Sequence, residues 1–231
     1  MNKIKNISIS LLFTLFLNIV LPIGSVKAAS KEISDPIITF NNIEYSLTEN
    51  ENNEFILKNL VTGTEDILTF SENKNGINQV TLNESTGEQH VIENEIKTGE
   101  VTLDSQDISE IESSIITSEP ADFSLSRVGY SWKYIRTQNS NTNVAYRKLS
   151  LIVSIILAIT PVSPSVGVAT AVAQYIIDNN LKTLYTQRKE YYRSDKTNIH
   201  KYKVSYYKYS NYTGLIRSTS YTRDIYGNVH G

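Results

Sequence analysis

The sequence contains no cysteine in its 231 residues. A chain without thiols forms no disulfide and carries no lipid-modified cysteine or thiol nucleophile. Histidine is nearly as scarce. The three histidines, His90, His200 and His230, lie far apart, and they lack a metal-ligand spacing such as H-E-x-x-H. The sequence therefore offers neither cysteine chemistry nor a histidine metal motif.

Common catalytic motifs are also missing. There is no G-x-S-x-G nucleophile elbow, no phosphate-binding Walker loop, no G-x-G-x-x-G fingerprint and no D-x-D-x-D-G calcium loop. Carboxylates are abundant, but nothing distinguishes a pair such as Glu93 and Glu95 from ordinary surface charges. We therefore predict a protein that is not an enzyme, with no catalytic residue, no metal ligand and no cofactor.

The first 28 residues resemble a secretory signal peptide. Lys3 and Lys5 form a positive start, Ile7–Leu21 is apolar, and Val26-Lys27-Ala28 fits a small-residue cleavage site. We expect a secreted, extracellular protein whose mature chain starts at Ala29 or Ser30. The richness in Lys, Asn and Ile suggests a Gram-positive source.

The net charge of −2 hides an uneven distribution of charge. Residues 30–125 carry 20 acidic and 4 basic side chains, whereas residues 126–231 carry 15 basic and 4 acidic ones. Such asymmetry favours an acidic segment that pairs with a basic or membrane-facing one. Two independently soluble domains of unrelated charge are the alternative.

The acidic half has the pattern of short strands joined by tight turns. Gly63, Gly87 and Gly99 each follow a threonine, and glycine supplies the positive φ that β-hairpin loops need. We expect strands at 54–57, 66–70, 79–82, 89–92 and 100–103. The sequence thus predicts a β-meander domain over residues 29–104, followed by a linker over 105–126.

The basic half, residues 127–231, contains a long stretch without charge from Leu149 to Ile177. Pro161 and Pro164 interrupt it, and proline disfavours a continuous helix. We expect two helices, one over about 144–159 and one running from Ser165 towards Tyr191, which together form an apolar helical hairpin over 144–191. The uncharged part of each helix spans about 11 to 14 residues, or roughly 16 to 21 Å, which is short of the ~30 Å hydrocarbon core of a bilayer.

Flanking strands complete the predicted fold of this half. Residues 128–134, 199–209 and 215–226 alternate in polarity as strands do. The expected fold class is α+β, with an acidic N-terminal β-meander followed by a small antiparallel sheet that carries the inserted apolar helical hairpin.

Two sets of side chains are candidates for contact with a membrane. Gly167 and Ala171 have the small-xxx-small spacing of closely packed helices in lipid. The bulky residues expected to insert are Leu151, Ile152, Ile155, Ile156, Ile159, Val168, Val172 and Ile176. The alternative is that these side chains form an ordinary buried core.

Aromatic and basic residues alternate along the flanking strands, and this suits the interface of an anionic membrane. The residues concerned are Trp132, Lys133, Lys201, Tyr202, Lys203, Tyr206 and Lys208. Tyrosine is also simply a good strand residue. Base stacking on single-stranded nucleic acid is a third reading, which secretion disfavours.

The layout resembles large, cysteine-free secreted bacteriocins of Gram-positive bacteria, of the unmodified geobacillin-like kind. The resemblance rests on the VKAAS signal end, the acidic first half, GYSWKYIRT at 129–137, the uncharged stretch, and KYKVSYYKY at 201–209. It implies an antibacterial protein that acts at the membrane, and we expect an anionic bacterial membrane and an immunity protein as partners, and no nucleic acid. From the uneven charge, we expect the basic half to perturb the membrane through the helical hairpin, which the acidic half masks. The alternative is a non-enzymatic cell-surface binding or structural module.

Overall fold

The computed structural model describes residues 35–50, 53–72, 76–112, 129–160, 166–224 and 229–230. Asp35–Gly231 form one compact unit. Three predicted features lie outside the described residues: the signal peptide, the prolines at 161 and 164, and residues 113–126 of the linker.

The acidic half forms an antiparallel meander, sheet A, in which eight strands follow one another in sequence order. The strands are β1 (Ile37–Phe40), β2 (Ile43–Glu49), β3 (Glu54–Asn59), β4 (Glu65–Glu72), β5 (Ile77–Asn83), β6 (Gln89–Glu95), β7 (Val101–Leu103) and β8 (Gln106–Asp107). The predicted Thr-Gly turns are confirmed, because Gly63, Gly87 and Gly99 all have positive φ.

The basic half contributes most of a second antiparallel sheet, sheet B, with the order β14-β13-β12-β11-β10-β9. Its strands are β9 (Ser109–Glu112), β10 (Trp132–Asn143), β11 (Thr183–Arg193), β12 (Lys196–Tyr207), β13 (Leu215–Asp224) and β14 (Val229–His230). Strand β9 falls within the segment expected to be a linker. It pairs with β10, and Glu112 lies opposite Asn139 in this pairing.

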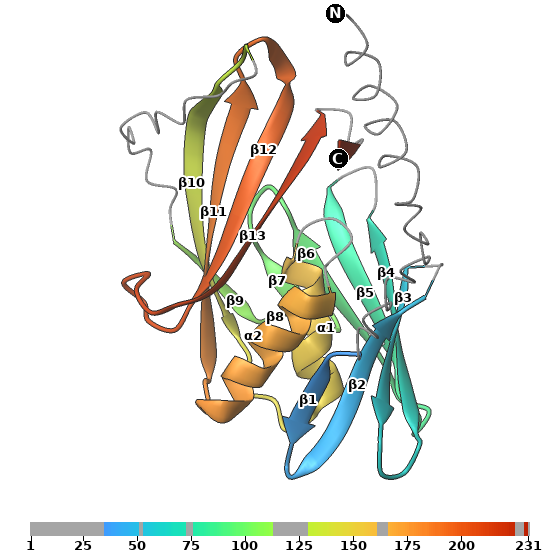
Figure 1. Ribbon diagram of the computed structural model, residues 1–231. Helices are drawn as coiled ribbons and strands as arrows, with labels where there is room; N and C mark the ends of the chain where they lie inside the picture. Colours follow the sequence, from blue (N-terminus) through green and yellow to red (C-terminus); the bar gives the residue numbers. More distant parts are fainter. Residues whose placement is uncertain are drawn as a thin grey trace, which may run out of the picture. The chain divides into compact units, whose positions relative to one another are not determined.

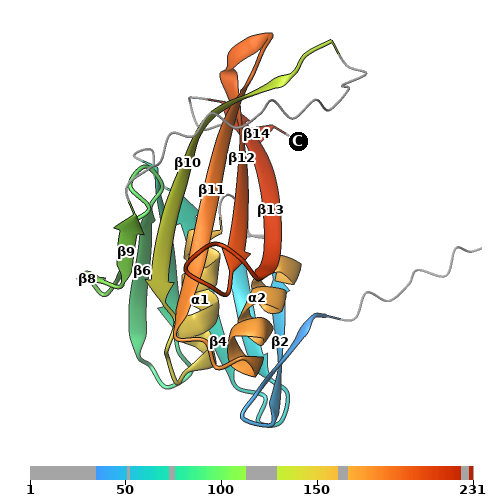
Figure 2. The same cartoon turned by 90° about the vertical axis from the view of Figure 1, so that its left-hand side faces the viewer.

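Two short helices, α1 (Leu149–Ile159) and α2 (Val166–Asp178), lie between the two sheets (Figures 1 and 2). Helix α1 packs against β4, β5 and β6 of sheet A, while α2 packs against β1, β2 and also β13 of sheet B. All 11 residues of α1 are buried. Neither helix of the described ranges is long and apolar enough to cross a membrane.

The predicted α+β fold class is wrong. The described chain is mainly β, and its helices form no apolar hairpin inserted on the basic sheet, because they pack largely on the acidic sheet. The second helix was also expected to run to Tyr191, but it ends at Asp178. Asn180 then takes a left-handed conformation with φ 48°, which a continuing helix does not permit.

The residues from Thr183 to Arg193 instead form strand β11. Ile177, Leu181 and Leu184 have helical spacing, and this favoured the longer helix. In the structure the relevant period is two, since Leu184 and Thr186 are buried while Tyr185 between them is half-exposed. Packing against β10 and β12 decides between the two periods.

The two halves share one hydrophobic core. Phe55 and Leu68 of sheet A, Ile156 of α1, and Leu184 and Tyr206 of sheet B belong to a single buried cluster. Burying such side chains contributes about 1.5 to 3 kcal/mol each. The halves are therefore held together mainly by apolar contacts around the helices.

Opposite charges also meet across the two halves. Arg223 of β13 donates a hydrogen bond from Nη2 to Glu72 Oε1 of β4 at 2.6 Å. Arg188 of β11 donates to the Ile96 carbonyl at the end of β6. The acidic half thus supplies a carboxylate, and the basic half a guanidinium group, to an ion pair between the two sheets.

Candidate functional site

The β-hairpin formed by β5 and β6 holds both ends of α1. At the C-terminal end, the side-chain amides of Asn78 and Asn94 donate hydrogen bonds to the Ala158 carbonyl at 3.2 and 3.1 Å. This carbonyl lies in the last turn, where helix carbonyls lack intrahelical partners. A buried helix end needs such partners, and sheet A supplies them.

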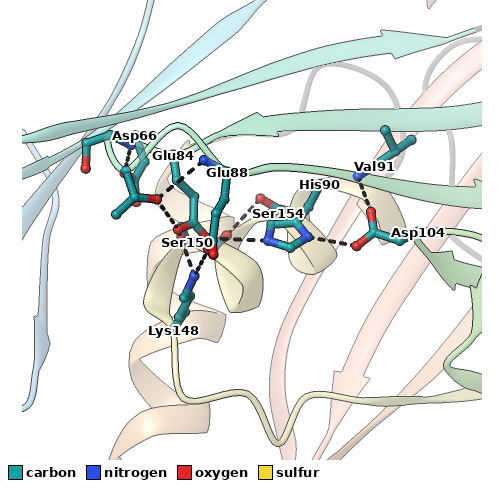
Figure 3. Close-up of polar contacts among 11 residues, drawn as sticks. Asp66, Glu84, Glu88, His90, Val91, Asp104, Lys148, Ser150 and Ser154 are labelled. Carbon is teal, nitrogen blue, oxygen red and sulfur yellow. Dashed lines mark hydrogen bonds and ion pairs between the residues drawn. The ribbon is translucent and has the colours of Figure 1, made fainter.

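The other end of α1 is held by an ion-pair cluster at the turn of the same β-hairpin (Figure 3). Lys148 Nζ, just before the helix, donates to Glu84 Oε2 at 2.9 Å and to Glu88 Oε2 at 2.5 Å. These hydrogen bonds raise the pKa of Lys148, with Glu88 as the larger contributor. The hydrogen bond from Lys148 and its charge in turn lower the pKa of Glu88. The ammonium therefore stays charged between two carboxylates.

His90 extends this cluster along β6. Its Nδ1 lies 2.8 Å from Asp104 Oδ2, and its Nε2 lies 3.7 Å from Glu84 Oε1. Burial alone would raise the pKa of the Asp104 carboxyl, but hydrogen bonds from His90 and from the Val91 amide outweigh it and lower that pKa. The ionised Asp104 carboxylate accepts a hydrogen bond from the N–H group at His90 Nδ1. This hydrogen bond fixes the orientation of the ring.

A pocket of about 270 Å³ adjoins the cluster at the start of α1. Its lining includes Asp66, Glu84, Lys148 and Ser150 together with the apolar Leu57. Typical small-molecule sites have volumes of about 300 to 1,000 Å³, so this pocket is slightly smaller than that range.

The cluster lacks an activated hydroxyl nucleophile among the described residues. The nearby Ser154 donates its hydroxyl proton to the Ser150 carbonyl at 2.8 Å, one turn back in α1 (Figure 3). Nucleophilic catalysis needs a hydroxyl hydrogen-bonded to the base, and here His90 faces carboxylates. The arrangement is suited to holding a cation.

A second surface of interest lies on sheet B, on the side away from α1. Tyr206 of β12 contacts Thr160 at the end of α1, so the odd-numbered Lys201 and Lys203 of this strand point to the opposite side. Lys201 Nζ lies 5.9 Å from the centre of the Trp132 ring. Lys203 is exposed and lies opposite Lys189 in register.

Two tyrosines complete this surface. Tyr134 and Tyr191 meet edge to face with ring centres 5.8 Å apart, and Tyr191 lies opposite Lys201 in register. We call this surface the basic aromatic face. It consists of Trp132, Tyr134, Lys189, Tyr191, Lys201 and Lys203.

The structure separates the membrane-surface residues predicted from the sequence. Trp132, Lys201 and Lys203 come together on the basic aromatic face. Tyr202 and Tyr206 lie on the opposite side of β12, where Tyr206 is fully buried. The other two predicted residues lie elsewhere: Lys133 is exposed opposite Tyr192, and Lys208 donates to Asn179 Oδ1 at 3.1 Å.

The residues predicted to insert in a membrane are all covered. Leu151, Ile152, Ile155, Ile156, Ile159, Val168, Val172 and Ile176 are buried. Gly167 is exposed and Ala171 is half-buried, whereas Val168, Ala169, Val172, Ala173 and Ile176 form the buried side of α2.

Sequence reasoning missed a further polar cluster on sheet B. The Glu190 carboxylate accepts hydrogen bonds from Arg136 Nε at 2.6 Å and Tyr202 Oη at 3.0 Å, and lies 2.8 Å from His200 Nδ1. Burial alone would raise the pKa of Glu190, but the hydrogen bonds from His200 and Arg136 lower it. Burial raises the pKa of Tyr202. The available signal was Glu190 itself, an isolated acid in a basic strand.

Neither a family model, nor a curated protein, nor a solved structure matches this chain.

Proposed function

We propose that this chain is a secreted, non-enzymatic protein that binds an anionic bacterial membrane through the basic aromatic face of sheet B. The observation that carries the proposal is the alignment of Lys189, Lys201 and Lys203 beside three aromatic rings on the side of the sheet away from α1. Three cations in one patch create a local positive potential.

The physical chemistry of the face fits an anionic membrane surface. A lysine near such a surface contributes about 1 kcal/mol, and tryptophan and tyrosine favour the interface between headgroups and hydrocarbon. Because Lys201 already lies over the Trp132 ring, a bound headgroup would meet charge and aromatic surface together.

Binding to vesicles tests the proposal. The protein should sediment with phosphatidylglycerol vesicles and remain in solution with phosphatidylcholine vesicles. The double variant Lys201→Ser/Lys203→Ser should bind at least about tenfold more weakly, since it loses two cations from the face. Binding by the wild type should weaken as salt is raised from 50 to 500 mM, roughly the range over which screening becomes strong.

A matched variant distinguishes a specific effect of the basic aromatic face from a general effect of net charge. Lys182→Ser/Arg217→Ser removes two exposed cations elsewhere and should leave vesicle binding unchanged. Equal weakening by both double variants would mean that net charge alone is responsible, and would overturn the assignment of the face.

Membrane perturbation is a second candidate function, favoured by helix α1. This helix lacks charged residues, and all of its residues are buried, with sheet A and α2 as its main neighbours. In this proposal the protein is bacteriocin-like, and α1 enters lipid only after the acidic sheet A separates from it. Antibacterial activity and an immunity protein that blocks it belong to the same proposal, and a growth-inhibition assay on related Gram-positive bacteria tests both.

A further inference from the structure

We propose that Glu84, Glu88 and His90 form a binding site for one divalent transition-metal cation, in which the Lys148 ammonium is the resident competitor. The candidate ligand atoms, one from each residue, all lie within 4.8 Å of one another. Zinc binds nitrogen and oxygen ligands at about 2.0 to 2.2 Å, so two ligands of one ion lie no more than about 4.4 Å apart. The three side chains must therefore move slightly closer together to contact a single ion.

The orientation of His90 is the first argument for a metal. Asp104 Oδ2 lies 2.8 Å from Nδ1, and a carboxylate can only accept, so Nδ1 carries the proton. The lone pair of the neutral ring is then on Nε2, which faces Glu84. A carboxylate that orients a histidine in this way is the usual support for a metal-bound imidazole.

The state of Glu84 is a second, independent argument. This residue is only 8% exposed, and its Oε1 accepts no hydrogen bond although the atom is buried. A buried carboxylate oxygen without a partner costs free energy. Oε1 lies 3.7 Å from His90 Nε2, so a cation between these two atoms would satisfy both.

The composition of the site indicates the class of ion. One imidazole and two carboxylates suit Zn²⁺ and its neighbours among the transition metals, whereas Ca²⁺ and Mg²⁺ prefer oxygen ligands alone. Three protein ligands leave a coordination position open for water. Lys148 Nζ now contacts Glu84 Oε2 and Glu88 Oε2, so it must move away when the ion binds.

Displacement of Lys148 distinguishes this site from a simple ion-pair cluster. Replacing Lys148 by Met keeps the length of the side chain but removes the competing charge. If the Lys148 ammonium competes with the metal ion for the carboxylates of Glu84 and Glu88, the Lys148→Met variant should bind Zn²⁺ more tightly than the wild type. A carboxylate cluster without a site would gain nothing specific from the change.

Isothermal titration calorimetry of the purified chain with zinc chloride tests the proposal. We expect one saturable site, at least tenfold weaker in His90→Ala and Glu84→Gln and at least tenfold tighter in Lys148→Met. The matched control is His200→Ala, which removes the other described histidine–carboxylate pair and should leave zinc binding unchanged. Circular dichroism of each variant confirms that it is folded.

Three results would overturn the site. They are no saturable zinc binding by the wild type and by Lys148→Met, wild-type affinity in folded His90→Ala, and no gain in affinity in folded Lys148→Met.

Discussion

Tyr206 of β12 donates a hydrogen bond to Thr160, the C-cap residue that follows α1, with 2.8 Å between the two hydroxyl oxygens. The donor is Tyr206, because the Thr160 hydroxyl already donates to the Ile156 carbonyl. Both residues are buried, and burial raises the pKa of Tyr206. This contact ties the apolar helix to sheet B, while Asn78 and Asn94 tie the same end to sheet A.

Replacing Tyr206 with Phe tests the contribution of this bond. Loss of a buried hydrogen bond costs about 1 to 2 kcal/mol, so the free energy of unfolding in urea should fall by that amount. Tyr207→Phe is the control, because Tyr207 is half-exposed, and its unfolding midpoint should match the wild type. A Tyr206→Phe variant as stable as the control would show that the bond contributes nothing.

The burial of α1 predicts a large difference between two isoleucines. Ile156 is 0% exposed and Ile67 is 40% exposed. Ile156→Ala should destabilise the fold by about 2 to 5 kcal/mol, since it leaves a cavity between the sheets. Ile67→Ala should change stability by no more than about 0.5 kcal/mol. Thermal and urea unfolding measure both, and similar small losses would mean that α1 is not part of a packed core.

Stability should depend on the ionisation of Glu190. Its carboxylate faces Arg136, Arg188, His200 and Tyr202, and its pKa in the folded chain is lowered. The folded state therefore binds fewer protons than the unfolded state, and stability rises with pH in this region. The contribution is present above the unfolded-state pKa of 4.5 and disappears as pH falls through the lower folded-state value.

Urea unfolding at pH 7 and at about pH 3 measures this effect. Glu190→Gln should cost about 2 kcal/mol at pH 7, because hydrogen bonds to a charged group are lost, and it should cost less at pH 3. Exposed Glu44→Gln is the control and should have little effect at either pH. An equal cost of Glu190→Gln at both pH values would contradict the assignment.

An engineered disulfide tests whether α1 must be released for membrane perturbation. A Cβ on Gly99, in the turn before β7, would lie 3.7 Å from the Ser140 Cβ of β10, and disulfides need about 3.5 to 4.5 Å. The chain has no other cysteine, so Gly99→Cys/Ser140→Cys forms a single bridge between the two sheets. A cysteine at the positive φ of Gly99 costs about 1 to 2 kcal/mol.

If α1 acts in lipid, the oxidised bridge should abolish dye release from anionic vesicles, and reduction should restore it. Ser140→Cys alone should behave as the wild type under both conditions. Dye release by the oxidised double variant, or none by the wild type, would leave surface binding as the remaining function.

Local patterns were sufficient to predict much of sheet A. The Thr-Gly pairs at Gly63, Gly87 and Gly99 placed its turns, because the conformational need for glycine is a property of a few neighbouring residues. The end of α2 was not predictable in this way. Leu181 and Leu184 satisfy a helical period, whereas Leu184 and Thr186 satisfy a strand period, and only pairing of β11 with both of its neighbours decides between them.

The candidate sites depend on contacts between distant residues. Lys148 meets Glu84 and Glu88 across 60 or more positions, and no spacing rule links such partners. The sequence alone does not single out His90, because no other histidine lies near it. Its partner in the structure is Asp104, which lies in the turn after β7. Alternation along β12 did predict that Lys201 and Lys203 share a side.

The position of α1 between the sheets also has a consequence for the order of folding. Strands β1 to β8 are complete by Asp107, but the helix that covers them begins only at Leu149. During synthesis, which starts at the N-terminus, sheet A exposes its apolar surface, including Phe55 and Leu68, until α1 has been synthesised. Contacts so far apart in sequence slow folding, and the uncovered intermediate is prone to aggregation. A chaperone that shields sheet A until the helix emerges would raise the yield of native protein.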